Sequence, residues 1–256
     1  MILEEFINNI RSNKLEVVDL TQPLNEETPI LTLPEEFGQT IPFKKKEISK
    51  YDEKGPGWYW NNFETGEHTG THLDSPNHWV TGKDKYSVDQ IPVEMLIGNG
   101  CLIDMEKEVE ENSNALLTPS HIKEWEKQNG NMPKNSWVLI KTGWSSRFND
   151  PEAYANFNTN DQMPNTPGIS KEASELLANE KDVLGVGVET VGTDAGIAPL
   201  FDPQFPNHNI MHGAGKMGLT SLCNLDLIPP KGAIIIALPL KIENGSGSPV
   251  RVIAIK

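Results

Sequence analysis

Hydrophobic and polar positions follow two different periods along this chain, one typical of helices and one typical of strands. Residues 2–12 carry isoleucine, leucine or phenylalanine every three or four positions, which predicts a short amphipathic helix that lies on the body of the protein or on a second subunit. Residues 16–20 predict the first strand. Residues 21–42 are rich in proline and glutamate, which favours an irregular arm.

Short apolar runs later in the chain predict a series of buried strands, at residues 98–105, 136–142, 183–188, 232–238 and 249–255. Residues 44–50 mix charge with a single isoleucine and predict an edge strand. Helices are predicted over about 119–128 and 170–180, each opened by a threonine or serine that can serve as N-cap. The acidic run at residues 106–111 is expected to be a solvated loop.

About three helices against eight or more strands predict a mixed α/β domain whose sheet core carries one helical layer. The chain has 256 residues, of which 37% are hydrophobic, enough for a sizeable core. It contains no repeat, no low-complexity tract and no obvious linker. We therefore expect a single domain over residues 1–256, with an N-terminal helix and arm over about 1–42.

A cluster of aromatic residues follows the turn at residues 55–57. Trp58, Trp60 and Phe63 stand close together, just before the stretch with the most distinctive chemistry. One interpretation is a strand packed in the core, where aromatic residues are common. The other is a rigid apolar surface that contacts a flat substrate. The sequence alone leaves both open.

The distinctive stretch is Glu-His-Thr-Gly-Thr-His-Leu-Asp-Ser-Pro-Asn-His-Trp, at residues 67–79. Three of the six histidines of the chain lie in it, together with one aspartate. Neutral imidazole and carboxylate are common ligands of divalent transition metals. We therefore expect His68, His72 and Asp74 to bind a metal ion, and His78 to serve in proton transfer.

The spacing of these residues restricts the backbone that could bring them together. In a strand, His68 and His72 would stand about 13 Å apart, too far for one ion whose metal–nitrogen bonds are about 2.1 Å. In a helix the two histidines would share a face, but Asp74 would point elsewhere. A bend at Gly70 followed by an extended segment brings the histidines together and puts His72 and Asp74 on one face.

The donor set also restricts the kind of metal site. Zinc-finger spacing is absent, and three protein ligands leave open positions for water and substrate, as a catalytic metal requires. Two nitrogen donors and one carboxylate without a thiolate suit Mn(II), with Zn(II) and Fe(II) as competitors. Intrinsic affinity does not favour manganese among these ions, so metal supply in the cell has to decide.

Composition argues against several partners. The net charge of −14 argues against nucleic acid and against anionic membrane surfaces. No apolar stretch reaches the length of a membrane-spanning helix. Cys101 and Cys223 lie far apart without a Cys-x-x-Cys motif, which is typical of buried thiols in a reducing compartment. The N-terminus shows no signal-peptide pattern, so a cytoplasmic location is expected.

The pattern His-x-Gly-Thr-His-x-Asp-x-Pro-x-His at residues 68–78 resembles the metal-dependent cyclase family of hydrolases, which includes bacterial arylformamidases and isatin hydrolases. The resemblance covers nearly the whole chain, since other segments agree with the family at residues 18–21, 141–144, 167–170 and 224–226. It implies a swivelling β/β/α fold, a homodimer or higher homo-oligomer, and a small aromatic amide as the substrate.

Within this family the isatin hydrolases are the most similar group, through segments at residues 28–31, 48–52, 66–68, 78–84, 192–196 and 239–243. The resemblance implies that a metal-activated water opens the cyclic amide of isatin, or of a similar compound, to isatinate. His78 would move the proton. A flat bicyclic ring would be flanked by four aromatic side chains, Trp58, Trp60, Phe63 and Trp79.

One departure from the arylformamidases bears on the metal. Those relatives carry a glutamate twelve residues after a histidine, and the pair helps to bind a second zinc ion. Counted from His208, this position is Thr220. The resemblance therefore implies a single manganese site. It leaves His208 free to face the metal and hydrogen-bond the substrate, with His212 as the competitor for that role, and it places Ser221 near the site.

Three other functions remain open at this level. The first is hydrolysis of N-formylkynurenine, an amide cleaved by the same chemistry. The second is a non-haem iron oxygenase, because His72-x-Asp74 matches the start of a triad of two histidines and one carboxylate; the nearby third histidine, His68, argues against it. The third is a metal-dependent binding protein without catalysis, and His78 beside an open metal site argues against that.

Overall fold

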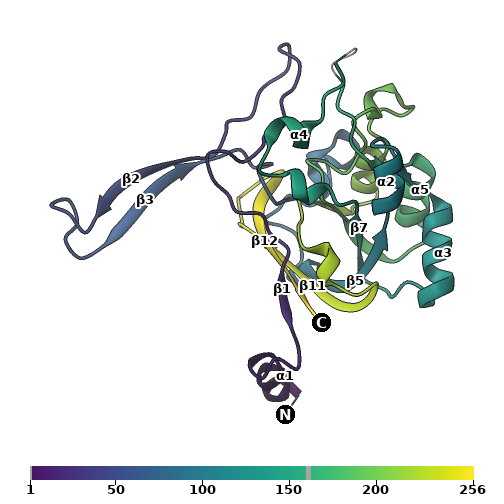
Figure 1. Ribbon diagram of the computed structural model, residues 1–256, viewed down its shortest axis with the longest axis horizontal. Helices are drawn as coiled ribbons and strands as arrows, with labels where there is room; N and C mark the ends of the chain where they lie inside the picture. The colour runs from purple at the N-terminus through teal and green to yellow at the C-terminus, as the bar shows by residue number, and fades with distance from the viewer. Residues whose placement is uncertain (1, 160–162) are drawn as a thin grey trace.

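Eight strands form one mixed sheet that closes on itself. The computed structural model describes residues 2–159 and 163–256. β4 pairs with β12 as well as with β10, which closes the sheet into a ring (Figure 1). Strands β5, β7, β9 and β10 run parallel to one another, and the other pairings are antiparallel. The strand order is β1 (Val17–Asp19), β12 (Gly247–Ile255), β11 (Lys231–Pro239), β5 (Ile97–Asp104), β7 (Ser136–Lys141), β9 (Val183–Val188), β10 (Met217–Thr220) and β4 (His72–Asp74).

The alternation of side chains along these strands builds two apolar cores. In β7, Trp137 and Leu139 belong to the core inside the ring, whereas Val138 and Ile140 belong to the core on its outer face. All four side chains are buried. Strands that are buried on both faces appear in a sequence as continuous apolar runs, which is why the hydrophobic pattern identified them.

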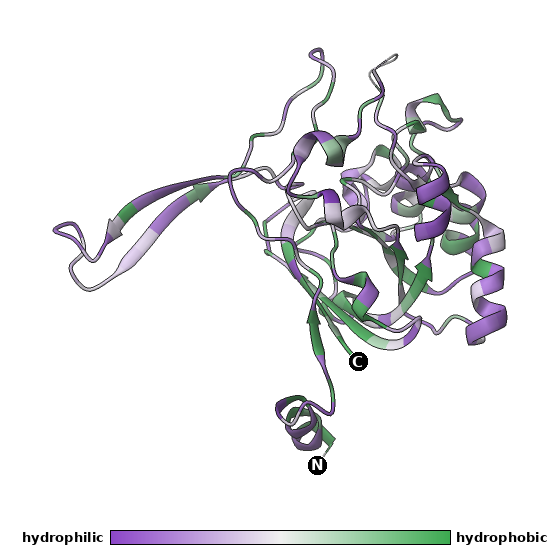
Figure 2. Ribbon diagram, viewed as in Figure 1, coloured by the Kyte–Doolittle hydropathy of each residue, from purple (hydrophilic) through white to green (hydrophobic). Residues whose placement is uncertain are grey.

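Three helices cover the outer face of the sheet: α2 (Glu106–Glu111), α3 (Pro119–Asn129) and α5 (Lys171–Asn179). Figure 1 places them together on one side, and Figure 2 shows that the strands beneath them are mainly hydrophobic. The short parallel pair β6 (Leu116–Leu117) and β8 (Gly168–Ile169) precedes α3 and α5. The expected mixed sheet core with few helices in one layer is confirmed.

Helices α3 and α5 begin at the predicted caps. Thr118 forms a capping box with His121, in which each side chain meets the backbone N–H of the other. The hydroxyl of Ser170 accepts a hydrogen bond from the backbone N–H of Ala173 at 3.2 Å. These side chains satisfy N–H groups that have no partner within the helix, so they fix the residues where α3 and α5 begin.

The acidic run at residues 106–111 is the helix α2, so the expectation of a loop there is wrong. Asp104 accepts a hydrogen bond from the backbone N–H of Glu106 at 3.0 Å, and Val109 is buried beneath the helix. Glutamate and lysine favour helices, and acidic residues stabilise a first turn. With α1 (Ile2–Arg11) and α4 (Pro151–Ala155), the described residues contain five α-helices, more than the three expected.

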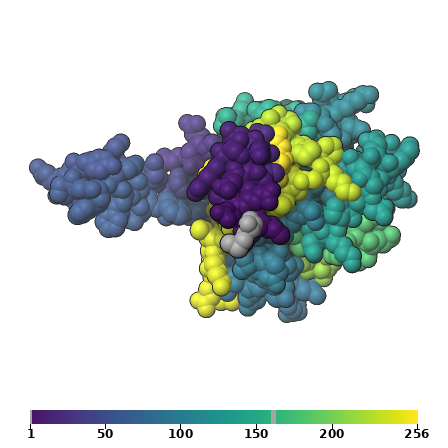
Figure 3. Space-filling model, turned by 90° about the horizontal axis from the view of Figure 1, so that it is seen from below, coloured from purple at the N-terminus to yellow at the C-terminus, as the bar shows by residue number. Residues whose placement is uncertain are grey.

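Strands β2 (Lys44–Lys50) and β3 (Tyr59–Glu64) form a two-stranded hairpin outside the main sheet. Figures 1 and 3 show that this hairpin projects away from the body of the protein. Trp58, Trp60 and Phe63 are 51%, 54% and 61% exposed. The interpretation of this segment as a strand packed in the core is therefore wrong, because no second layer among the described residues covers the hairpin.

Helix α1 also stands at the surface of the protein. It buries none of its residues, and Ile2 and Leu3 are almost fully exposed. The strand that follows it, β1, is held by its pairing with β12. Across residues 2–159 and 163–256, no helix is both long enough and apolar enough to cross a bilayer.

Candidate metal centre

The stretch at residues 67–79 bends at its glycine. Gly70 has a φ of +64°, which glycine adopts at low cost, and the chain then runs on as β4. Leu73 points into the inner core, so His72 and Asp74 share the opposite face of the strand. The structure thus contains both the bend and the shared face that the spacing predicted.

Two imidazole nitrogens converge on one carboxylate oxygen. His68 Nδ1 lies 2.7 Å from Asp74 Oδ1, and His72 Nε2 lies 3.3 Å from the same atom. Asp74 is 2% exposed. Burial opposes ionisation of this carboxyl group, but the charges and hydrogen bonds of His72 and His68 outweigh burial and hold the pKa of Asp74 well below its usual range.

The orientation of His72 follows from the strand pairing. Thr220 stands opposite His72 in the β10–β4 ladder, and its hydroxyl lies 2.8 Å from Nδ1 and 3.0 Å from Nε2. The same Nδ1 lies 2.8 Å from the carbonyl oxygen of Gly70. An Nδ1–H that donates to this carbonyl leaves the lone pair of Nε2 on the side of Asp74, as a metal-binding imidazole requires.

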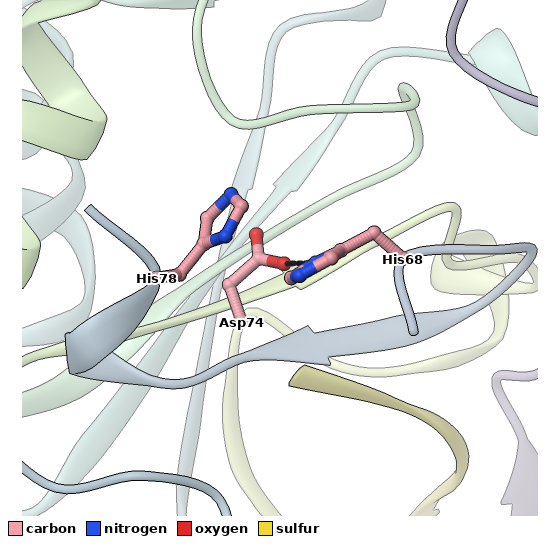
Figure 4. A group of neighbouring side chains, drawn as sticks. All are labelled: His68, Asp74 and His78. Atoms are coloured by element: carbon pink, nitrogen blue, oxygen red, sulfur yellow. Dashed lines mark hydrogen bonds and ion pairs between the residues drawn. The ribbon is translucent and has the colours of Figure 1, made fainter. Parts of the chain in front are cut away.

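His78 lies against the ring of His68. A single 3-10 turn, η1 (Pro76–His78), returns the chain to the site, and the two ring centroids are 4.0 Å apart. Figure 4 shows His68, Asp74 and His78 pointing toward one another, with the hydrogen bond between His68 and Asp74 drawn. Burial lowers the pKa of His78 to about 2, against the opposing charge of Asp74. His78 is therefore neutral at neutral pH and able to accept a proton.

His208 and His212 complete the cluster from one π-helical turn, η6 (His208–His212). Their ring centroids lie 5.7 Å and 5.9 Å from that of His78. Trp79 lies beside them, with its ring 4.9 Å from the ring of His208. Five of the six histidines of the chain therefore gather at one place, and π-helical turns are common at such functional sites.

Asp194 fixes the ring of His208. Its Oδ2 accepts a hydrogen bond from the backbone N–H of His208 at 3.0 Å and lies 2.5 Å from Nδ1. Burial lowers the pKa of His208, but the hydrogen bond and charge of Asp194 outweigh burial and raise it above its usual value. His212 differs, because its Nδ1 faces the carbonyl of Lys216 at 3.0 Å and burial lowers its pKa to about 4.

The cluster offers its donors in two overlapping groups. Among the described residues, His68, Asp74 and His78 bring one donor atom each to within 4.8 Å of one another, and so do Asp74, His208 and His212. Imidazole nitrogens around a buried, ionised carboxylate are the donors that suit a divalent transition metal. The residues at this site therefore fit a metal ion.

The predicted substrate-binding residues fall into two sets. Trp79 lies in the cluster, against His208. Ser221 directly follows Thr220 in the chain, and its hydroxyl accepts a hydrogen bond from the phenol of Tyr154 at 2.9 Å. The remaining three belong to the hairpin, which projects from the body of the protein (Figure 1), and each is more than half exposed: Trp58, Trp60 and Phe63.

Sequence reasoning missed three polar residues behind these histidines. Asp194 and Ser246 contact His208 and His68, and Glu67 bonds to Ser246. The hydroxyl of Ser246 lies 2.9 Å from His68 Nε2 and donates to Glu67 Oε2 at 2.7 Å. Glu67 could have been found, because a carboxylate next to a candidate ligand is a frequent partner of that ligand. No local pattern pointed to Ser246, which stands 178 positions after His68.

This fold and this donor set define a class, the α/β proteins that can hold a divalent ion between histidine and carboxylate side chains. The Cyclase family model matches residues 18–195 of the chain. An isatin hydrolase from Roseibium aggregatum is 44% identical over 248 residues, which are 95% of this chain and 93% of that protein. A kynurenine formamidase from Salinibacter ruber is 29% identical over 73% of this chain and 74% of that protein.

A solved structure also shows similarity to an isatin hydrolase. An isatin hydrolase bound to the product analogue thioisatinate matches with a TM-score of 0.96 and 42% sequence identity, over 100% of this chain and 97% of that one. The chain therefore belongs to the Cyclase family. The fold expected from the resemblance is confirmed by this match.

Proposed function

We propose that this protein is a metal-dependent amidohydrolase that opens the cyclic amide of isatin to isatinate. The observation that carries the proposal is the convergence of His68 Nδ1 and His72 Nε2 on one oxygen of Asp74. Beside them lies a neutral imidazole, that of His78. The relatives named isatin hydrolase, one of them with a product analogue bound, support isatin as the substrate.

His68, His72 and Asp74 would hold one divalent ion, Mn(II), with Zn(II) as the alternative. When bound, the ion polarises the amide carbonyl and activates a water molecule. Thr220 supports a single ion, because it offers no anionic ligand and its hydroxyl already lies within 3.0 Å of both ring nitrogens of His72. The proposed ligand set differs from the nearest group of donors, in which His78 stands in place of His72.

His78 is proposed to move the proton. It accepts a proton as the water oxygen joins the carbonyl carbon, and it delivers that proton to the ring nitrogen as the carbon–nitrogen bond breaks. One water is consumed, its second proton is released as the new carboxylic acid ionises, and the product carries a carboxylate and an aromatic amine. The neutral state of His78 supports this role, because a protonated imidazole could not accept the proton.

His208 is proposed to hold the substrate carbonyl or the product carboxylate. Asp194 occupies Nδ1 of this ring, so Nε2 is the atom available to a substrate. His212 is the alternative, but at 2% exposure it is more enclosed than His208, whose side chain is 12% exposed. Trp79 would cover one face of the substrate ring, and Ser221 is buried next to Thr220.

A homodimer or higher homo-oligomer is part of the proposal. The hairpin carries Trp58, Trp60 and Phe63 away from the cluster of their own chain, so we place these side chains at the site of a second copy. A two-stranded hairpin is marginally stable when nothing covers it.

A cytoplasmic location is also proposed. Cys101 and Cys223 are both free thiols, which supports a reducing compartment. Burial raises the pKa of Cys101, and burial together with nearby carboxylates raises the pKa of Cys223 to about 11. Both are therefore held as unreactive thiols at neutral pH.

The test of the proposed function compares two substrates. Rates on isatin and on N-formylkynurenine are measured with Mn²⁺-loaded protein, in air and without oxygen. We expect kcat/KM on isatin to be higher by about tenfold or more, a difference of about 1.4 kcal/mol in transition-state binding, and to be independent of oxygen. Preference for the formamide would make the protein an arylformamidase, and a need for oxygen would make it an oxygenase. Binding of isatin without turnover would make it a binding protein.

A further inference from the structure

A line of polar side chains runs behind His68, on the side of its ring away from Asp74. His68 Nε2 lies 2.9 Å from the hydroxyl oxygen of Ser246. That hydroxyl donates to Glu67 Oε2 at 2.7 Å, and the backbone N–H of Ser246 donates to the same oxygen at 3.2 Å. The proposed function gives Glu67 and Ser246 no role.

The direction of these hydrogen bonds follows from the groups themselves. A carboxylate can only accept, so the single hydroxyl hydrogen of Ser246 goes to Glu67. The oxygen of Ser246 then has only lone pairs to offer His68, and Nε2 must supply the hydrogen. In the structure Nδ1 donates to Asp74 at 2.7 Å. Where a metal ion replaces that hydrogen, the hydrogen held on Nε2 would leave the lone pair of Nδ1 for the ion.

The backbone around Ser246 is shaped to bring it this close. A side chain at Gly247 would place its Cβ 2.5 Å from Cε1 of His68, and one at Gly245 would place its Cβ 3.0 Å from Oε1 of Glu67. The carbonyl of Ser246 accepts hydrogen bonds from the backbone N–H of Ser75 at 3.0 Å and from its hydroxyl at 2.7 Å. These contacts tie the loop before β12 to the end of β4.

We propose that Ser246 and Glu67 are positioning residues that present Nδ1 of His68 to the metal ion. The inference rests on the proposed function, because it needs the ion that His68, His72 and Asp74 would hold. Partners of this kind orient a ligating imidazole and make it a stronger donor, and their loss weakens metal binding by about 10- to 100-fold. Neither residue touches the substrate or the reacting atoms.

The experiment measures the affinity for Mn²⁺ alone by titration calorimetry, on protein from which metal has been removed. We expect Ser246→Ala to raise the Kd for Mn²⁺ by about tenfold or more. Ser246→Thr keeps a hydroxyl and should restore the Kd to within about threefold of the wild type. Glu67→Gln keeps an acceptor without charge and should weaken binding less than Ser246→Ala.

Ser248→Ala is the matched control. Ser248 lies two positions further along, is fully buried, and its hydroxyl bonds only to the backbone of Leu240 and Pro249. This variant should bind Mn²⁺ as the wild type does. At saturating Mn²⁺, Ser246→Ala should regain most of its kcat, because the role of Ser246 is exerted through metal affinity.

Two results would overturn the positioning role. One is an unchanged Kd in Ser246→Ala. The other is an equal loss of affinity in Ser246→Ala, Ser246→Thr and Ser248→Ala, which would show a general disturbance of the β12 end. A wild-type protein that binds Mn²⁺ one to one but does not hydrolyse isatin would refute the proposed substrate and leave the positioning role standing. A wild-type protein that binds no divalent ion would refute both.

Discussion

The histidine cluster and the hairpin β2–β3 differ in how much of their surroundings this chain supplies. In the cluster, side chains from β4, β10 and η6 meet, and His68 has a partner at each ring nitrogen. In the hairpin, Trp58, Trp60 and Phe63 are more than half exposed, and the two strands pair only with each other. The chain thus orients its own reactive groups, whereas its aromatic surface is exposed, and we propose that a second copy covers it. We therefore expect substitutions in the two regions to change different quantities.

The largest effect is expected from Asp74→Asn. Both His68 and His72 converge on this carboxylate, so its neutral replacement should abolish metal binding and lower kcat/KM by on the order of 10³-fold or more. Metal content and isatin hydrolysis would be measured on the same sample. His121→Ala is the control, because His121 is the one histidine outside the cluster. If Asp74→Asn retained both metal and full activity, the histidine cluster would be neither the metal site nor the active site.

His78→Ala should separate chemistry from metal binding. Loss of a positioned base costs about 10²- to 10⁴-fold in rate, while the ion stays bound to the other three side chains. Single-turnover rates on isatin and the Mn²⁺ content of the variant are the two readouts. If the metal is lost as well, His78 is a ligand, which its position in the donor group with His68 and Asp74 would allow.

His208→Ala should have a smaller effect, on the order of tenfold in kcat or KM, about 1.4 kcal/mol. Asp194→Asn should reproduce part of this effect, because Asp194 holds Nδ1 of the same ring. Both variants should retain one ion per chain. Loss of metal in His208→Ala would instead make His208 a ligand, together with Asp74 and His212, and the single-site account would fail.

In the hairpin, Trp60→Ser should leave metal content unchanged and weaken self-association. Removing a buried aromatic anchor from an interface costs about 2 kcal/mol or more, roughly a thirtyfold rise in the dimer Kd. Light scattering across a dilution series measures this, and KM for isatin should rise as the oligomer dissociates. Phe157→Ser serves as the control, since Phe157 is similarly exposed but lies outside the hairpin. A monomeric wild-type protein with full activity would contradict the role given to the hairpin.

Local sequence signals predicted the parts of this structure that depend on neighbouring residues. The bend at Gly70, the shared face of His72 and Asp74, and the caps Thr118 and Ser170 all follow from contacts within a few positions. The loop expected at residues 106–111 is a helix because Val109, the one buried residue of this segment, packs beneath it, and a single apolar residue among charged ones gives no clear helical pattern.

The remaining features depend on contacts between distant parts of the chain. Ser246 reaches His68 across 178 positions, and Asp194 meets His208 only because β9 and η6 are brought together by the sheet. The exposure of the hairpin follows from a missing contact, since nothing in residues 2–159 and 163–256 forms a layer over Trp60. A hydrophobic pattern indicates that a side chain needs a partner, but it does not say whether that partner belongs to the same chain.

We propose that one divalent ion, held by His68, His72 and Asp74, makes this protein an isatin hydrolase. The most direct test removes metal with a chelator and then adds Mn²⁺ stepwise while isatin hydrolysis is followed. If a single ion is required, metal-free protein should be inactive, and activity should rise in proportion to bound Mn²⁺ until one ion is bound per chain. Full activity without metal, or activity that saturates only at two ions per chain, would contradict it.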